Sequence, residues 1–304
     1  MTAPRLVIGT RASTLAQAQT RLVAEALQHI GTRVEMVIEF ITTTGDRDVA
    51  VGEPVKGLFV KELEEALLRG DIGCAVHSVK DMPVTGTPGL EVAAILPRGD
   101  ARDALVARTH TSLADLPVGA VVGTSSPRRK AQVLAARPDV TAVPLRGNVD
   151  TRLRKLDDGE YDAIVLAAAG LERLGLAARI TERLDPLLFL PSPGQGALAV
   201  QIRSEDEPTR ALFAPLNDHA SAHAVRAEVA CAAALDGGCS SPFGALATVL
   251  GETLSLRAAV LSPDGRQQVA RSAEGPIGEP EALGARLAEH LLRDGAKELS
   301  GVAV

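Results

Sequence analysis

The sequence predicts an α/β fold for about the first 215 residues and a smaller α+β domain after them. Short apolar runs alternate with longer helical patterns over the first part, and this alternation is typical of α/β architecture. Beyond Asn217 the pattern changes to a helix, strand-like runs joined by a turn, and a final amphipathic helix. A chain of 304 residues, 46% of them apolar, can bury the cores of two or three domains.

The α/β part contains apolar runs of strand length separated by helical patterns. The strand candidates are 5–9, 72–78, 90–96, 120–126, 140–146, 161–169 and 196–202. The helix candidates, where apolar residues recur at helical spacing, are 15–30, 59–70 and 129–137. Two stretches rich in turn residues, 96–105 and 189–197, are the expected crossings between domains.

The last part of the chain predicts a small α+β domain. Residues 243–250 are a strand candidate, and 253–272 are expected to form a hairpin. Its turn is predicted at Pro263, Asp264 and Gly265, which are residue types that favour turns. An amphipathic helix from about Glu281 to Arg293 completes the domain.

The composition argues against a partner that is bound through a basic surface. The formal net charge is −6, whereas non-specific binding to nucleic acid or to an anionic membrane requires a net basic surface. Trp is absent and aromatic residues are only 2% of the chain, so stacking on single-stranded nucleic acid has little support. No export signal is visible, and the longest uncharged stretch, 186–202, is interrupted by prolines and glycines. We therefore expect a cytoplasmic protein without a membrane span.

Only one of the three cysteines is expected to be available for chemistry. Cys74 and Cys231 lie in apolar runs of strand and helix type, and they are predicted to be buried. Cys239 follows Gly237 and Gly238 after an alanine-rich helical run. The odd count and the lack of a Cys-x-x-Cys pair argue against a disulfide or a zinc site, and we expect no metal.

Cys239 is expected to lie just beyond the end of a helix, because a glycine pair is typical of a helix C-terminus. The negative end of the helix dipole tends to raise the pKa of a thiol, which does not favour a fast nucleophile. A thiol that is used once, to anchor a group covalently, has a weaker rate requirement. The position therefore favours a tether over a catalytic cysteine.

Three strand ends carry small polar and basic residues. They are Arg11 with Ser13; Ser78 with Lys80 and Asp81; and Ser125 or Ser126 with Arg128 and Arg129. Ligands of open α/β sheets bind at the carboxyl ends of strands, where free N–H groups of helix N-termini attract anions. Arginines at this edge predict a site for a carboxylate or a phosphate. The sequence has no Walker A motif, so a nucleoside triphosphate is not the expected ligand.

The serines before Pro127 predict how two of the arginines are placed. Ser125 or Ser126 can cap a helix that begins at Pro127, which puts Arg128 and Arg129 into its first turn. Basic residues there oppose the helix dipole, and a bound anion would offset that cost. The alternative is a solvated surface pair, and the same alternative holds for the arginines at 146, 152 and 154.

Asp81 is the candidate acid. It follows a strand, neighbours Lys80 and precedes Met82 and Pro83, which stop regular strand pairing. A single carboxyl group in a site lined with arginines could donate a proton and then stabilise a developing cation. The alternative is an ordinary surface pair of Lys80 with Asp81.

Seven motifs together resemble the porphobilinogen deaminase family, also called the hydroxymethylbilane synthases. They are GTRASTLA, KGLFVKELEEALL, AVHSVKDMP, GTSSPRRKAQ, LRGNVDTRLRKLDDGEYDAIVLAAAGLERLG, LPSPGQGALAV and LDGGCSSPFGA. They occur in the family's order and cover most of the first 245 residues. The remaining C-terminal residues carry little of the resemblance.

The resemblance implies stepwise condensation of four porphobilinogen molecules, each with loss of ammonia, into linear hydroxymethylbilane for tetrapyrrole biosynthesis. It also implies a dipyrromethane cofactor attached through a thioether, and the family's attachment cysteine matches Cys239. The family's catalytic aspartate matches Asp81, which would assist ammonia loss and stabilise a positively charged, azafulvene-like intermediate. Each pyrrole unit carries an acetate and a propionate, so such a site needs many cationic side chains.

The resemblance also assigns residues to the cofactor and to the substrate. The residues that would hold the cofactor are Ser78, Lys80, Thr124, Ser126, Arg128 and Arg129. Those that would bind substrate and the growing pyrrole chain are Arg11, Ser13, Arg146, Arg152, Arg173 and Gln195. Phe59 matches a position in the family's mobile active-site region.

The family fold implies two α/β domains that are similar to periplasmic binding proteins and surround a cleft, plus a small α+β C-terminal domain. The expected boundaries are 1–97 with 195–215 for domain 1, 98–194 for domain 2, and 216–304 for domain 3. Domain 1 would carry Asp81, domain 2 the arginine-rich side, and domain 3 Cys239. We expect a monomer whose partners are porphobilinogen and the growing pyrrole chain, with no nucleic acid and no membrane.

Two other classes of protein share part of this pattern. A two-lobed binding protein for a small carboxylate would show the same alternation of strands and helices, but it has no need for Asp81 or Cys239. A hydrolase that pairs Cys239 with His77 or His223 is the second alternative. Nothing in the sequence orients either histidine toward the thiol.

Overall fold

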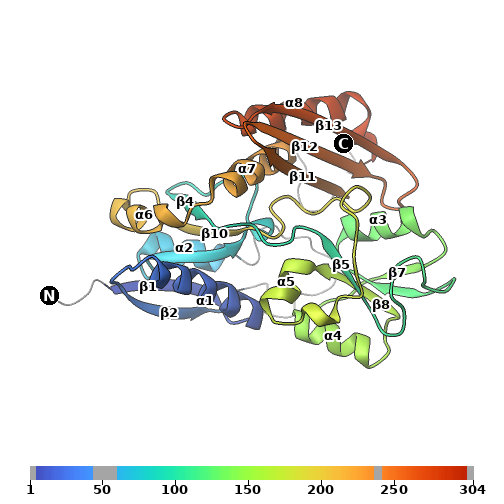
Figure 1. Ribbon diagram of the computed structural model, residues 1–304, viewed down its shortest axis with the longest axis horizontal. Coiled ribbons are helices and arrows are strands. Elements are labelled where there is room, and N and C mark those ends of the chain that lie inside the picture. Colours follow the sequence, from blue (N-terminus) through green and yellow to red (C-terminus); the bar gives the residue numbers. More distant parts are fainter. Residues whose placement is uncertain (1–4, 44–59, 236–241, 300–304) are drawn as a thin grey trace. The chain divides into compact units, whose positions relative to one another are not determined.

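The structure is a computed structural model that describes residues 5–43, 60–235 and 242–299 (Figure 1). The chain divides into two compact units, one made of residues 1–99 and 197–222 and the other of residues 100–196 and 223–304. The chain therefore leaves the first unit after Gly99, returns after Gly196 and leaves again after Ala222.

The first unit is built on a five-stranded mixed sheet in the order β2-β1-β3-β10-β4. Its strands are β1 (Arg5–Arg11), β2 (Glu35–Ile41), β3 (Cys74–Ser78), β4 (Leu90–Ile95) and β10 (Leu198–Arg203). β1 runs parallel to β2 and β3, whereas β10 runs antiparallel to β3 and β4. Its described helices are α1 (Thr14–His29), α2 (Lys61–Arg69) and α6 (Glu207–Phe213), with short 3-10 turns at Val79–Asp81 and Ala214–Leu216.

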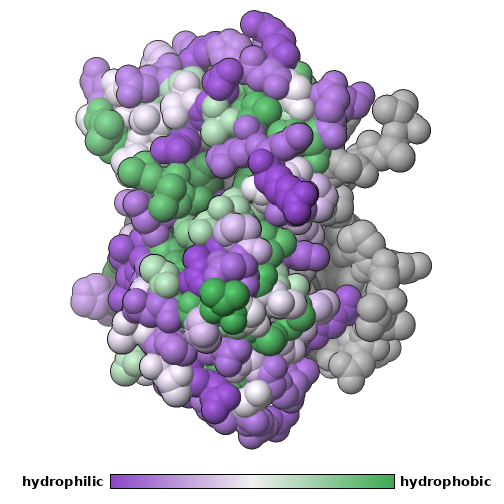
Figure 2. Space-filling view, turned by 90° about the vertical axis from the view of Figure 1, so that its right-hand side faces the viewer, coloured by the Kyte–Doolittle hydropathy of each residue, from purple (hydrophilic) through white to green (hydrophobic). Residues whose placement is uncertain are grey.

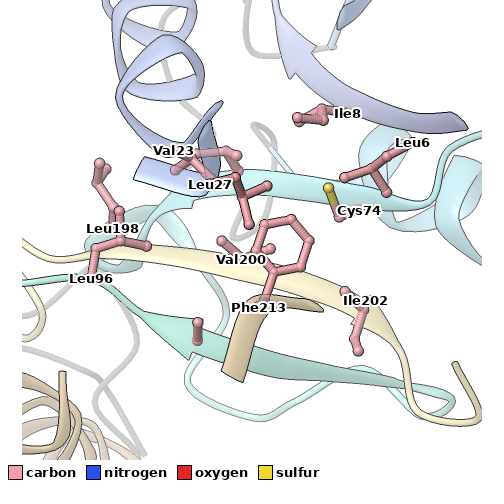
Figure 3. Close-up of a cluster of buried hydrophobic side chains, with 12 residues drawn as sticks. Leu6, Ile8, Val23, Leu27, Cys74, Leu96, Leu198, Val200, Ile202 and Phe213 are labelled. Carbon is pink, nitrogen blue, oxygen red and sulfur yellow. The ribbon is translucent and has the colours of Figure 1, made fainter. Parts of the chain in front are cut away.

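Different helices cover the two faces of this sheet. On one face, Val23 and Leu27 of α1 and Phe213 at the end of α6 pack on Cys74 and Val200 of the central strands (Figure 3). The cluster on the other face, beneath α2, contains Leu63, Ala66, Leu67, Ile72, Ala75 and Leu90. Because successive strand residues point to opposite faces, β3 is buried on both sides, and this explains its continuous apolar run.

The second unit contains a five-stranded sheet in the order β7-β6-β8-β5-β9. Its strands are β5 (Asp103–Ala107), β6 (Val121–Gly123), β7 (Thr141–Val143), β8 (Ala163–Ala167) and β9 (Glu182–Arg183). Its helices in this part of the chain are α3 (Pro127–Ala136), α4 (Val149–Asp157), α5 (Ala168–Arg173) and a 3-10 turn at Ala177–Arg179. β6 runs parallel to β7 and β8, and β5 runs antiparallel to β8 and β9.

The two sheets have the same topology, although the sequence shows no internal repeat. In each, three parallel strands are followed across the sheet by one antiparallel strand and then by a strand parallel to the first three. The antiparallel strand is the one formed when the chain arrives from the other unit, namely β10 in the first sheet and β5 in the second. The carboxyl ends of the parallel strands therefore share one edge of each sheet with the amino end of the arriving strand.

The C-terminal part of the second unit holds a three-stranded antiparallel sheet. The elements are α7 (His219–Ala234), whose residues before His223 belong to the first unit, β11 (Phe243–Leu250), β12 (Thr253–Leu261), β13 (Gln268–Pro276), α8 (Pro280–Arg293) and α9 (Ala296–Leu299). α8 lies across β12 and β13 (Figure 1). The hairpin between these strands turns at Gly265, whose φ is 72° and whose N–H donates to Ser262 O at 2.9 Å. The predicted fold class, α/β with a smaller α+β part, is confirmed.

Most predicted elements are present, and the differences have local causes. β2 and β5 are not predicted, because β2 is a half-exposed edge strand and the first three residues of β5 belong to the turn-rich stretch 96–105. Residues 161–169 are predicted as one strand, but β8 ends at Ala167 and α5 begins at Ala168. A continuous apolar run is compatible with either structure.

The visible surface is mainly polar. Figure 2 shows one face on which hydrophilic side chains predominate and hydrophobic ones gather in small patches. Within residues 5–43, 60–235 and 242–299, every helix is too short or too polar to cross a bilayer.

Candidate active site

A small pocket, here called the Asp81 pocket, lies at the carboxyl ends of β1 and β3 in the first unit. Its described lining residues are Arg11, Ala16, Gln19, Val60, Val76, His77, Ser78 and Asp81. Arg11, Ser78 and Asp81 are among the site residues predicted from the sequence. This edge of the sheet is where ligands of α/β proteins bind.

Local structure places the polar groups of the Asp81 pocket. Arg11 ends β1, and Ser13 caps α1, because its side chain accepts a hydrogen bond from the Ala16 N–H at 3.3 Å. Ser78 ends β3, and its Oγ accepts from Gln19 Nε2 at 2.8 Å. Gln19 is not predicted from the sequence; the signal that could have found it is an amide on the buried face of an amphipathic helix.

Asp81 is held in the 3-10 turn that directly follows β3. The Met82 N–H closes this turn by donating to Val79 O at 3.0 Å. Asp81 is half-buried, and it is the one carboxyl group among the described residues that line the pocket. A ligand at the end of β3 can therefore meet a carboxyl group and the guanidinium of Arg11.

His77 lines the same pocket, but it is not a second acid. Burial lowers the pKa of His77 to about 4; the positive charge of Arg11 also lowers it, and a hydrogen bond with Gln201 acts in the opposite direction. The imidazole is therefore neutral at neutral pH. Within the described lining of the pocket, proton donation to a ligand is left to Asp81.

The second unit carries the predicted arginine pair at the start of α3. Ser126 caps this helix, Pro127 is its first residue, and Ser126 Oγ accepts from the Arg129 N–H at 3.4 Å. Thr124 is buried next to the cap, and its Oγ1 accepts from the Ser126 N–H at 3.2 Å. The predicted cap and the predicted position of Arg128 and Arg129 in the first turn are confirmed.

Arg128 and Arg129 are not a solvated surface pair, because only 5% of the surface of Arg128 and 7% of that of Arg129 is exposed. Both bind Asp103, the first residue of β5. Arg128 Nη1 lies 2.6 Å from Asp103 Oδ2, and Arg129 Nη2 lies 2.8 Å from Asp103 Oδ1. Asp103 is missed by the sequence analysis, because an acid in a turn-rich stretch is usually solvated; its place before a short apolar run was the available signal.

The arginines keep Asp103 ionised. Burial alone raises the pKa of a carboxyl group, but the charges of Arg128 and Arg129 outweigh burial here. Together with hydrogen bonds from Arg128 and Gln195, they hold the pKa of Asp103 well below its usual range. The site therefore contains two guanidinium groups and one carboxylate.

Gln195 and Arg173 belong to the same part of the second unit. Gln195 is completely buried; its Nε2 donates to Asp103 Oδ1 at 2.9 Å, and its Oε1 accepts from Arg129 Nη2 at 3.3 Å. Arg173 ends α5, and its Nη2 donates to Gly196 O at 2.6 Å. Burial lowers the pKa of the Arg173 guanidinium, which marks a partly desolvated cation.

Arg146 and Arg152 follow β7 at the same edge of the second sheet. Arg146 lies in the exposed loop before α4, and Arg152 lies in the first turns of α4, where its Nε donates to Gly147 O at 2.6 Å. Arginines therefore follow each of the three parallel strands β6, β7 and β8. The carboxyl edge of this sheet is therefore rich in guanidinium groups, some buried and some exposed, which suit a ligand with several carboxylates.

The cysteines of the described chain are inert. Burial raises the pKa of the Cys74 thiol far above its usual range and raises the pKa of Cys231 to about 12. The prediction that both are buried is confirmed. Cys239 and Phe59, the two other predicted site residues, lie outside the described residues.

Each of the two α/β sheets carries arginines at its strand ends, and the first also carries Asp81; this is the kind of site that binds small molecules bearing carboxylates. Family models agree: "Porphobilinogen deaminase, dipyromethane cofactor binding domain" matches residues 6–211, and "Porphobilinogen deaminase, C-terminal domain" matches residues 222–293. The chain belongs to the porphobilinogen deaminase family.

Close relatives cover 97% of the chain. A porphobilinogen deaminase of Roseiflexus sp. (strain RS-1) is 50% identical over 299 residues, which cover 97% of this chain and 98% of the relative. That of Thermus thermophilus is 49% identical over 295 residues, covering 97% of both chains. Among solved structures, the methionine-binding protein MetQ is 14% identical with a TM-score of 0.45, covering 70% of this chain and 89% of its own. The relatives favour the enzyme over a two-lobed binding protein.

Proposed function

We propose that the protein condenses four porphobilinogen molecules, one after another and with loss of ammonia, into the linear tetrapyrrole hydroxymethylbilane. The observation that carries this proposal is membership of the porphobilinogen deaminase family across both matched domains. The basic strand ends support it, because porphobilinogen carries an acetate and a propionate, and every added unit brings two more carboxylates. The reaction belongs to tetrapyrrole biosynthesis.

The family's cofactor, dipyrromethane, fits the donors of the second sheet. Two pyrrole units of this kind carry four carboxylates, and the first turn of α3 offers the guanidinium groups of Arg128 and Arg129. When bound, the cofactor supplies the pyrrole end to which new units are joined. The residues proposed to hold it are Ser78, Lys80, Thr124, Ser126, Arg128 and Arg129, with Cys239 as the thioether attachment.

We assign the proton transfer to Asp81. The amino group of porphobilinogen leaves as ammonia, and it leaves more easily when its nitrogen stays protonated. Asp81 can hold that proton on the departing nitrogen, and its carboxylate then stabilises the positive charge left on the pyrrole.

The remaining assignments follow the same chemistry. The residues proposed to bind substrate and the growing pyrrole chain are Arg11, Ser13, Arg146, Arg152, Arg173 and Gln195, and Phe59 is assigned to the active-site region. We propose three domains, with residues 1–97 and 195–215, 98–194, and 216–304. We further propose a cytoplasmic monomer that binds neither nucleic acid nor membrane; light scattering of the purified protein tests the monomer.

Intact-protein mass spectrometry tests the proposed function and its tether. We expect the purified protein to exceed the mass of its chain by two linked pyrrole units and to convert porphobilinogen to hydroxymethylbilane. Cys239→Ser should lose both properties. Cys231→Ala is the matched control, because the buried Cys231 thiol should not bind the cofactor. An unmodified wild-type thiol in protein that makes hydroxymethylbilane would contradict the tether, and an absence of turnover would contradict the function.

A further inference from the structure

Asp103 is a buried carboxylate of the second unit that the sequence analysis did not single out, and it contacts both arginines of α3. It is completely buried at the amino end of β5. Its Oδ2 accepts from Arg128 Nη1 at 2.6 Å, and its Oδ1 accepts from Arg129 Nε at 3.0 Å and from Gln195 Nε2 at 2.9 Å. A carboxylate that receives this many charged donors holds them in one geometry.

The contacts of Arg129 show what this geometry leaves for a ligand. Its Nε donates to Asp103, its Nη2 contacts Asp103 at 2.8 Å and Gln195 Oε1 at 3.3 Å, and its Nη1 donates to Val165 O at 3.2 Å. Arginine has five N–H groups, and hydrogen bonds within the described residues use three of them, one each on Nε, Nη1 and Nη2. The second N–H of Nη1 and the second N–H of Nη2, which also faces Asp103, are the ones that a ligand carboxylate can share.

Arg128 is held on more sides by the protein itself. Its Nη1 donates to Asp103, to Gln132 Oε1 at 3.0 Å and to Leu190 O at 2.7 Å, and Gln132 Nε2 also donates to Leu190 O at 3.0 Å. The guanidinium of Arg128 is thereby fixed between α3, β5 and the segment that leads to the second crossing. Its position supports that of Arg129 through the shared carboxylate.

The same cluster joins the two stretches by which the chain enters and leaves this unit. Gln195 Nε2 donates to Ala101 O at 2.8 Å, which links the second stretch to the first. Leu190 and Gln195 come from the second stretch, Ala101 and Asp103 from the first, and the arginines from α3. The arginine pair is therefore built on three separate segments that meet at one carboxylate.

The net charge of Arg128, Arg129 and Asp103 determines how much negative charge a ligand can add to them. Asp103 neutralises one of the two guanidinium groups, so the buried group of three side chains carries one net positive charge. A cation that is buried without compensation is unfavourable, and one ligand carboxylate supplies the missing negative charge.

We propose that Asp103 is a positioning residue, which orients the guanidinium of Arg129 so that the arginine pair binds one carboxylate of the pyrrole chain. Asp103 does not itself contact the ligand. This inference rests on the proposed function, because it identifies the anion as a pyrrole carboxylate.

The test compares Asp103→Asn with Asp100→Asn in the full-length protein. Asp100 is the matched control: it lies three residues earlier, it also pairs with two arginines, at 2.7 Å from Arg102 Nη2 and 3.1 Å from Arg183 Nε, and it does not contact the arginine pair of α3. Circular dichroism checks that each variant is folded. Intact mass then gives the fraction that carries the pyrrole adduct, and initial rates give KM and kcat for porphobilinogen.

We expect Asp103→Asn to lower the adduct-bearing fraction and to reduce kcat/KM by about a hundredfold, mainly through KM, because a misplaced binding group costs about this much. Asp100→Asn should stay near the wild-type values. A folded Asp103→Asn protein with the loading and KM of Asp100→Asn would overturn the inference. If wild type itself lacks adduct and turnover, the proposed function fails instead.

Asp103→Glu covers the case in which Asp103→Asn does not fold. It keeps the negative charge and displaces the carboxylate by one methylene group, so a positioning role predicts a folded protein with a raised KM and reduced loading. Wild-type KM and loading in Asp103→Glu would show that the charge alone is sufficient, and would overturn the positioning role.

Discussion

Gly265, at the tip of the β12–β13 hairpin, links the C-terminal sheet to the helix that carries the arginine pair. A Cβ atom at this position would lie 2.6 Å from Ala135 N of α3 and closer still to Ala131 O. The distance of 2.6 Å is about 0.8 Å inside the 3.4 Å at which ordinary contacts begin. Gly265→Ala therefore requires the hairpin and α3 to separate, whereas the φ of 72° adds a conformational cost of its own.

Gly251, in the β11–β12 turn of the same sheet, separates the two costs. Its φ is 64°, and a Cβ there would meet nothing within 4 Å. Both alanine variants force a left-handed backbone, at about 1–2 kcal/mol. Only Gly265→Ala adds overpacking, which typically costs about 1–3 kcal/mol. We therefore expect the free energy of unfolding of Gly265→Ala to be about 1–3 kcal/mol lower than that of Gly251→Ala.

Thermal unfolding followed by circular dichroism measures the difference. A destabilisation of 1 kcal/mol lowers Tm by about 2–4 °C in units of this size, so Gly265→Ala should melt roughly 2–12 °C below Gly251→Ala. Because α3 presents Arg128 and Arg129 in its first turn, Gly265→Ala should also raise KM for porphobilinogen, and Gly251→Ala should not. Equal melting temperatures would refute the close approach of the hairpin to α3.

Two further predictions concern the Asp81 pocket. Asp81→Ala should lower kcat by about 10²–10⁴-fold, which is the usual contribution of a general acid. The circular dichroism spectrum and the pyrrole adduct should stay as in wild type, and Asp71→Ala, at an exposed position, is the control. A wild-type kcat in Asp81→Ala would remove Asp81 from the reaction. His77 has a folded-state pKa of about 4, below the ordinary value of 6.5. Its contribution to stability is therefore fully present above about pH 6.5 and is lost as the pH falls toward 4, by up to about 3 kcal/mol. Urea unfolding at pH 7 and pH 5 should show a smaller loss for His77→Gln than for wild type, and an equal loss would place His77 outside this linkage.

The elements with the clearest periodicity are those the sequence predicts best. α1, α2 and α8 follow their amphipathic patterns closely, and β11 matches its predicted range. β5 is missed, because a five-residue strand that begins inside the turn-rich stretch 96–105 carries too little pattern to distinguish it from a loop. β5 forms the antiparallel strand only by pairing with β8, and its central residue Leu105 pairs with Val165, 60 residues further along the chain.

The candidate site divides in the same way. Capping chemistry is local, so Ser126, Pro127 and the first turn of α3 are readable from four consecutive residues. The partner of the arginines is not local: Asp103 precedes Arg128 by 25 residues and Gln195 follows it by 67. No one of the three segments that carry Asp103, Arg128 and Gln195 shows by itself that these side chains meet.

Residue chemistry and order along the chain were enough to indicate the family, to predict the basic strand ends and to make Asp81 the candidate acid, because motifs, caps and strand ends depend on neighbouring residues. Tertiary structure alone decided that Arg128 and Arg129 are buried, that Asp103 holds them and that His77 is neutral. Burial and long-range pairing arise only when distant segments pack together. The resulting desolvation and Coulomb interactions have no counterpart in the separate segments.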